Sequence, residues 1–227
     1  MRNRISARNR NLLLSLRRLK RTIDIQMSRF LIDNEKYNNL WVMFTDGDDN
    51  AFSDLYKLSY KMLYSYGLSF QITEELVRDI IQDLFVKLYT KPDLIKNFAT
   101  IKPFLLASMR NACINTIKAN KKYSGLEKIE SFELNFTVDE NRVEQKEEQD
   151  RINTLVTKVL SQLTVRQKEI IYLRFLHQMD YEEISRVMNL SEQAARNLTY
   201  RAFSKIRKNS SDYDLGIFLI LIVYYCK

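Results

Sequence analysis

Five polar side chains near the C-terminus recur at a spacing that places them along one side of a helix. They carry amide, phenol and guanidinium groups, which hydrogen-bond to the edges of bases and to phosphates in nucleic acids. These residues are Gln193, Arg196, Asn197, Tyr200 and Arg201, with Arg196 at the border of the face. An isolated helix of this composition could equally be a plain solvated helix, so its neighbours decide between the two interpretations.

The neighbouring sequence predicts a helix-turn-helix. A short helix over 181–188 precedes the polar one, and only three residues separate them. Ser191 can cap the second helix, and Asn189 tolerates the left-handed conformation that such turns often need. Small Ala195 and Ala202 on the opposite face allow close packing on the first helix. We therefore expect residues 163–208 to bind duplex DNA.

A second polar stripe is expected on a helix that Pro103 opens and that runs to about residue 122. It combines an aromatic ring, a hydroxyl, two amides and two lysines, which suit an unstacked single strand. Its residues are Phe104, Ser108, Asn111, Asn115, Lys118 and Lys122. A solvated helix face has a similar composition, so both interpretations stay open. Cys113 faces the other way and is expected in the core.

A third candidate surface is predicted on a helix over 73–90, capped by Thr73. Asp79, Gln82, Asp83 and Val86 share its outer face. An exposed valine between two acids and an amide fits a protein-docking patch, because apolar area gives affinity and charge gives register. The alternative is an ordinary solvated face.

Composition favours an all-α fold of two small helical domains. The 227 residues include only 4 glycines and 2 prolines, so turns that need unusual backbone angles are scarce. The net charge of +8 suits a polyanion partner. Two cysteines and one histidine exclude a metal cluster or a disulfide framework. No nucleophile, acid-base set or phosphate loop is recognisable, so we expect no enzyme, cofactor, metal or small-molecule substrate.

The chain divides into five segments by charge and periodicity. We expect a basic extension over 1–26, a helical domain over 27–122, an acidic linker over 123–143, a helix-turn-helix domain over 144–209 and an apolar tail over 210–227. The extension is either a nucleic-acid-binding arm or a consequence of translation that starts at Met27. It lacks the apolar run of a signal peptide. The tail is too short to span a bilayer and is expected to pack within the protein or on a partner. His177 is expected to be a surface residue.

Several separated motifs resemble the sigma-70 family of bacterial RNA polymerase initiation factors, in particular the extracytoplasmic-function (ECF) subgroup. The similarity covers about residues 37–208. It comprises residues 49–56, 79–85, Arg110, Asn111 and Lys118 in the first domain, and 163–174, 181–184 and 191–202 in the second. The first group is similar to sigma region 2 and the second to region 4.

The resemblance implies a cytoplasmic sigma factor, held at the membrane in some states through an anti-sigma factor. Asp79, Gln82 and Asp83 then hold the clamp of the largest polymerase subunit, and the flap is a further contact on core polymerase. Asn111 helps to capture a flipped base of the minus-10 strand, and the face from Arg196 to Arg201 touches the minus-35 element of promoter DNA. Asn115 and the pair Ala194–Ala195 depart from the common family pattern, so the promoter sequence cannot be carried over. A stand-alone helix-turn-helix regulator and a degenerate sigma that only sequesters core remain alternatives.

Overall fold

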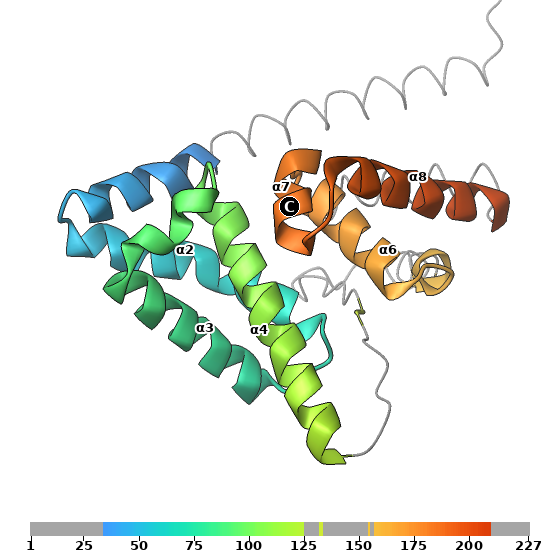
Figure 1. The fold of residues 1–227 in the computed structure, drawn as a ribbon, viewed down its shortest axis with the longest axis horizontal. Coiled ribbons are helices and arrows are strands. Elements are labelled where there is room, and N and C mark those ends of the chain that lie inside the picture. The colour runs from blue at the N-terminus through green and yellow to red at the C-terminus, as the bar shows by residue number, and fades with distance from the viewer. Residues whose placement is uncertain (1–33, 125–131, 134–153, 155–156, 210–227) are drawn as a thin grey trace, which may run out of the picture.

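The computed structural model describes residues 34–124, 132–133, 154 and 157–209 of the chain (Figure 1). The basic extension, most of the acidic linker and the apolar tail lie outside the described residues. Every regular element within these ranges is helical. The predicted all-α class is therefore confirmed for the part of the chain that the structure describes.

The N-terminal module, residues 34–124, contains the larger helices. A helix over 34–45 is followed by α2 (Asp49–Leu68), α3 (Glu74–Thr90), η1 (Pro92–Asn97) and α4 (Ile101–Ser124). Gly47 has a φ of +103° in the first turn, a conformation that a side chain would strain. Asp48 then caps α2 by accepting from the amides of Asn50 and Ala51.

Helices α2, α3 and α4 pack around an apolar core. Side chains at helical spacing along each of them point inward because this removes their apolar area from water. The fully buried ones include Leu55, Leu63, Ile81, Leu88 and Leu105. Cys113 is also buried, as predicted, and desolvation raises its pKa to about 12. Its role here is that of a small core residue.

The C-terminal module, residues 157–209, contains short helices that begin at well-defined caps. After a short helix over 157–161 come α6 (Val165–Ile171), the π-helical turn η3 (Tyr172–Leu176), α7 (Tyr181–Met188) and α8 (Glu192–Asn209). Thr164 and Asp180 form capping boxes with Gln167 and Glu183, each pair exchanging side-chain and backbone hydrogen bonds. These caps fix where α6 and α7 start.

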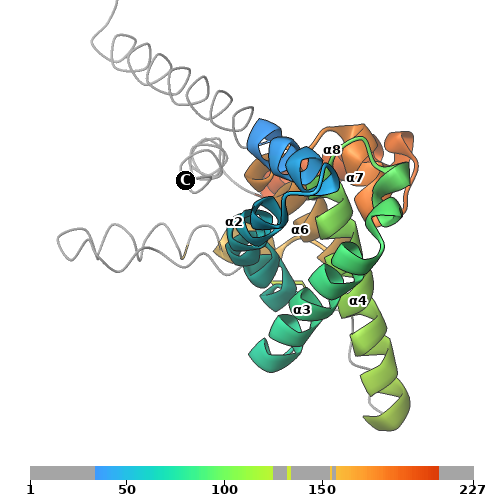
Figure 2. The same cartoon turned by 90° about the vertical axis from the view of Figure 1, so that its left-hand side faces the viewer.

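The two modules pack directly against each other. Helix α7 lies on α4, and α6 lies between α4 and α8 (Figures 1 and 2). One apolar cluster runs through both modules, from Tyr66 and Leu105 to Ile170 and Ile184. Within the described residues, helices long and apolar enough to cross a membrane are absent.

Candidate nucleic-acid interface and docking surface

The outer face of α8 presents the five polar side chains singled out in the sequence. Gln193, Arg196, Asn197, Tyr200 and Arg201 are all exposed, Tyr200 by 74%. Gln193 Nε2 donates to Asn197 Oδ1 at 3.1 Å, and the Arg196 guanidinium lies 4.5 Å from the centre of the Tyr181 ring. These contacts hold the side chains in an ordered row, which suits recognition of a regular groove.

The turn before α8 has the predicted geometry. Asn189 adopts the left-handed conformation at φ 52° and ψ 60°, and Ser191 Oγ accepts from the amide of Ala194 at 3.2 Å. Ala195 and Ala202 are fully buried on the inner face. The absence of larger side chains there lets α8 approach the helices beneath it closely, so the polar face is held on a rigid support.

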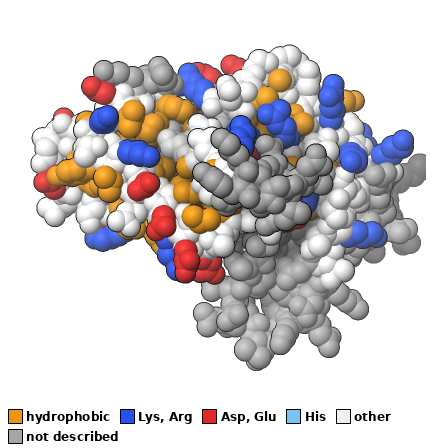
Figure 3. All heavy atoms as spheres, turned by 60° about the horizontal axis from the view of Figure 1, so that its bottom comes forward, with side chains coloured by type: hydrophobic (Ala, Val, Ile, Leu, Met, Phe, Trp, Pro, Cys, Tyr) orange, Lys and Arg blue, Asp and Glu red, His pale blue; other side chains and the backbone are white. Residues whose placement is uncertain are grey.

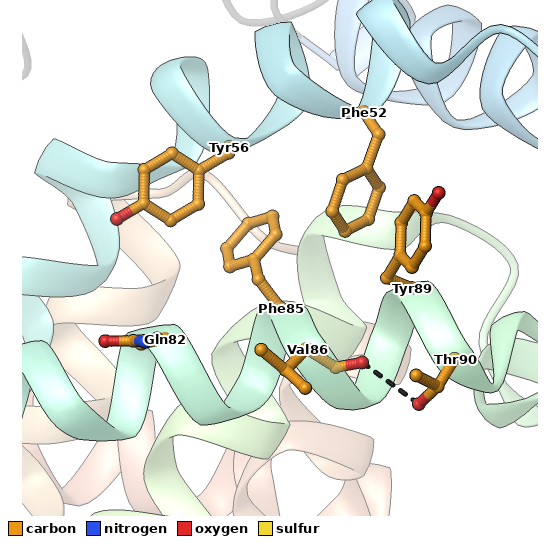
Figure 4. Close-up of a pocket in the computed structure, with 7 residues that line it drawn as sticks. All are labelled: Phe52, Tyr56, Gln82, Phe85, Val86, Tyr89 and Thr90. Carbon is orange, nitrogen blue, oxygen red and sulfur yellow. Dashed lines mark hydrogen bonds between the residues drawn. The ribbon is translucent and has the colours of Figure 1, made fainter.

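The predicted docking patch on α3 is open. Asp79, Gln82, Asp83 and Val86 are all exposed, Val86 by 57%. The patch adjoins an apolar groove of about 340 Å³ between α2 and α3 (Figure 4). The groove is lined by Phe52, Tyr56, Gln82, Phe85, Val86, Tyr89 and Thr90. Exposed apolar area beside acidic residues suits a helical protein partner that carries basic side chains.

The aromatic wall of this groove was not foreseen as a surface. Phe52 meets Tyr89 and Tyr56 meets Phe85 with their rings edge to face, at 5.1 and 4.9 Å between ring centres. The spacing of Phe52 and Tyr56 along α2 is close to that of buried residues, so it gives no sign that they line a surface groove. Figure 3 shows hydrophobic side chains gathered on the left-hand side of the molecule, the side of α2 and α3 in Figure 1, with acidic side chains nearby.

The stripe on α4 is only partly exposed. Asn111, Asn115 and Lys118 are exposed as predicted, and Ser108 is partly buried. The prediction that Phe104 faces outward is wrong, since only 8% of it is exposed and its ring packs edge to face on Phe98 at 5.5 Å. Residues 101–107 are all buried, and α4 packs on α2 and α3 of its own module as well as on α7 of the C-terminal module. The side chain of Lys122 lies outside the described residues.

A buried polar cluster joins the two modules and was not predicted. The Glu169 carboxylate of α6 accepts from Arg110 Nε at 2.7 Å, from Arg110 Nη2 at 3.3 Å and from Tyr66 Oη at 2.9 Å. We call Tyr66, Arg110 and Glu169 the Glu169 cluster. Burial, followed by the nearby Glu169 charge, raises the pKa of Tyr66 well above its ordinary value. The phenol therefore stays protonated and donates to the carboxylate.

Aromatic rings enclose the Glu169 cluster. The rings of Tyr66 and Tyr172 stack at 5.5 Å with an angle of 5° between their planes. Phe132 packs edge to face on both, and on Phe70 at 5.1 Å. The next residue, Glu133, donates its amide to Ser69 O at 2.8 Å and accepts from Lys168 Nζ at 2.6 Å. The chain between the modules therefore takes part in their contact.

His177 lies at the same boundary. Its ring packs edge to face on Tyr172 at 4.7 Å, and its Nε2 is buried without a hydrogen-bond partner among the described residues. Desolvation, with a smaller contribution from the Lys102 charge, lowers its pKa to about 3. The expectation of a surface residue was wrong for this histidine.

Groups of acids, histidines and cysteines that could hold a metal ion are absent from the described ranges. The chemistry that these residues offer is recognition: a polar helix face for a groove, a groove with acids for a protein, and amides and cations for a strand.

Comparison with known proteins supports this interpretation. Residues 154–206 match the family model described as sigma-70, region 4. The ECF RNA polymerase sigma factor SigM of Bacillus subtilis (strain 168) is 29% identical over 107 residues, which are 47% of this chain and 63% of SigM. The match thus spans less than two thirds of that relative. The solved structure of CnrH in complex with the cytosolic domain of CnrY aligns with a TM-score of 0.50 at 20% identity, covering 76% of this chain and 96% of CnrH. That likeness concerns the fold.

Proposed function

We propose that this chain, whose residues 154–206 match sigma-70 region 4 and which resembles ECF sigma factors more widely, is a sigma factor. It binds core RNA polymerase, directs it to promoter DNA and helps to open the two strands. The observation that carries this proposal is the presence of an open protein-docking patch on α3 together with a region 4 helix-turn-helix on the same chain.

Promoter contact is divided between the modules. The face of α8 from Gln193 to Arg201 contacts the minus-35 element as duplex, where guanidinium and amide groups reach base edges and phosphates. Asn111, Asn115 and Lys118 on α4 contact the minus-10 strand once it is unstacked. Ser108 and Lys122 complete the proposed strand-binding stripe, and the buried Phe104 is left out of it.

Strand opening draws its free energy from binding rather than from catalysis. Unstacking and flipping a base costs a few kcal/mol. Stacking on an aromatic side chain returns about 1–3 kcal/mol per base, and phosphate contacts add to it. The chain thus shifts an equilibrium and needs no enzymatic group or cofactor.

Core polymerase is held at the α3 patch. Asp79, Gln82, Asp83 and Val86 contact the clamp of the largest subunit, and the C-terminal module contacts the flap. The aromatic groove beside the patch adds apolar area to this contact. The acids give register, because basic residues must face them.

An anti-sigma factor is a further proposed partner. CnrH was solved with the cytosolic domain of CnrY, and this chain has a related fold. We place the sigma factor in the cytoplasm, held at the membrane when its anti-sigma factor is anchored there.

Run-off transcription with purified core polymerase over genomic fragments tests the proposal. The full chain is expected to bind core at low salt and to give discrete transcripts that core alone does not produce. A chain that fails to associate with core would overturn the proposal. Tight binding to duplex DNA without core would instead favour a stand-alone helix-turn-helix regulator.

A further inference from the structure

We propose that Arg110 and Tyr66 form a phosphate-binding site for a single DNA strand, and that Glu169 fills this site while the modules are packed together. The proposal rests on the proposed function only in taking the promoter strand as the ligand. It assigns two further residues to strand binding. It also makes strand binding compete with the packing of the two modules against each other.

The geometry of the Glu169 cluster is that of an anion site. Three donors, Nε and Nη2 of Arg110 and Oη of Tyr66, converge on one carboxylate at 2.7, 3.3 and 2.9 Å. A guanidinium binds a phosphate through the same planar pair of N–H groups. All three donors belong to the N-terminal module, whereas the anion comes from the C-terminal one. The site therefore stays assembled on α2 and α4 when Glu169 withdraws.

Charge along α4 indicates what the site is for. The helix carries Lys102, Arg110, Lys118, Lys121 and Lys122 and contains no aspartate or glutamate. A helix with five cations and no acid favours a polyanion. In the closed arrangement α6 supplies a carboxylate at the position of Arg110, next to the exposed Asn111. Glu169 thus stands where one phosphate of a bound strand would lie.

Burial explains why the site needs an occupant. Only 7% of Arg110, 2% of Glu169 and none of Tyr66 is exposed. While the modules are packed, a charge buried this deeply is stable only with its partner. When the modules part, a strand phosphate restores the lost interactions of Arg110. Binding of the strand and docking of α6 are then mutually exclusive at this site, and each weakens the other by the same factor.

The first test removes the internal anion from the full-length chain. Glu169→Gln keeps the size of the side chain and removes its charge. We expect this variant to bind a short labelled single-stranded DNA about tenfold more tightly than the unaltered chain, as is typical of coupled sites. Fluorescence anisotropy without polymerase measures the affinity, and circular dichroism checks that the helices are intact.

The second test asks whether Arg110 takes up the strand. In the Glu169→Gln background, Arg110→Gln is expected to abolish the gain and to reduce the slope of log K against log salt by about 0.7, the value for one phosphate contact on a single strand. The matched control is Lys57→Gln in the same background. Lys57 is an exposed cation on α2 that pairs with Asp54, so its loss gives the same net charge.

A further variant guards against misfolding. Tyr66→Phe keeps the ring that stacks on Tyr172 and removes only the donor hydroxyl. In the Glu169→Gln background it should weaken strand binding by a smaller factor than Arg110→Gln while leaving the salt slope unchanged, because the phenol carries no charge.

The outcomes separate this inference from the proposed function. Equal affinities and equal salt slopes for Glu169→Gln with and without Arg110→Gln would overturn the phosphate site and leave the ion pair as a purely structural contact. Core binding is measured on the same proteins. Loss of core binding with the predicted strand effects would overturn the sigma function and retain the site.

Discussion

The patch on α3 and the stripe on α4 differ in what covers them. Asp79, Asp83 and Val86 are open to solvent, whereas the first turns of α4 are buried and α7 of the C-terminal module packs on α4. A protein partner can thus reach α3 before the modules move. A DNA strand reaches the whole of α4 only afterwards. Under the proposed function, docking on polymerase can therefore precede strand capture.

Two kinds of interaction produce this difference. The α3 patch combines acidic side chains with a small apolar groove, so it can remain exposed to solvent until a partner binds. The α4 contact instead buries a charged pair, which is stable only while both partners remain. A substitution at the contact between the modules is therefore expected to change the equilibrium between packed and separated modules. A substitution in the α3 patch should change this equilibrium less.

Reversing a charge in the patch should have the largest effect. Asp83→Lys places a cation opposite the basic residues of the proposed partner, and like charges across an interface cost several kcal/mol. We expect core binding to weaken about a hundredfold, measured by titration of labelled core. Glu75→Lys makes the same reversal on α3 outside the patch and should bind normally. Equal binding of core polymerase by both variants would show that the α3 patch is not the docking surface.

Lowering the pH should destabilise the contact between the two modules. The pKa of His177 is lowered to about 3 in the folded chain, below the ordinary value of 6.5. The unfolded chain therefore takes up the proton first, so this contribution to stability is complete above pH 6.5 and is lost as pH falls toward 3. Between pH 7 and pH 5 the loss is up to about 2 kcal/mol.

Urea unfolding of the full chain at the two pH values measures this effect. His177→Gln removes the titrating group and is expected to flatten the pH dependence. The same steep dependence in the variant would assign it to other groups and would leave His177 without a part in holding the modules together.

Removing an amide from the open half of α4 should act on strand opening alone. Asn111→Ala takes away hydrogen bonds to a captured base and leaves its polar groups without partners, with an expected loss of about 1–3 kcal/mol in open-complex formation. Permanganate footprinting of the promoter measures opening, and core binding should be unchanged. Normal opening would show that the exposed half of α4 is an ordinary solvated face. Strand binding would then have to involve the buried half of this helix.

The smallest effect is expected in the turn between α7 and α8. Asn189 has a φ of 52°, which costs an ordinary side chain about 1 kcal/mol. Asn189→Ala should lower the stability of the chain by about this amount, whereas Asn189→Gly should be nearly neutral because glycine accepts the conformation. Thermal unfolding of both variants provides the measurement, and equal losses would contradict the strain argument.

Local features were predictable from sequence. The helices, the caps at Thr73 and Ser191, the left-handed Asn189 and the exposure of the α3 patch and the α8 face all depend on residues a few positions apart, and the structure confirms them. The family resemblance is likewise confirmed by the region 4 match and the SigM relative. The segment boundaries and the roles of the surface residues stay predictions.

Contacts between modules could not be predicted in the same way. Phe104 has the spacing of an outer residue, yet its ring is buried and packs on Phe98. Arg110 and Glu169 are 59 positions apart, and no periodicity relates them. One signal was available in the sequence. Arg110 lies between Met109 and Asn111 at the edge of the apolar face, and a cation buried there needs an anion from another part of the chain.

Phe132 and Glu133 lie between the two modules in the sequence and contact both of them. Phe132 packs edge to face on both Tyr66 and Tyr172, and Glu133 is hydrogen-bonded to Ser69 of one module and to Lys168 of the other. These two residues are thus part of the contact between the modules. Removing the Phe132 ring or the Glu133 carboxylate would therefore weaken the packing of one module on the other.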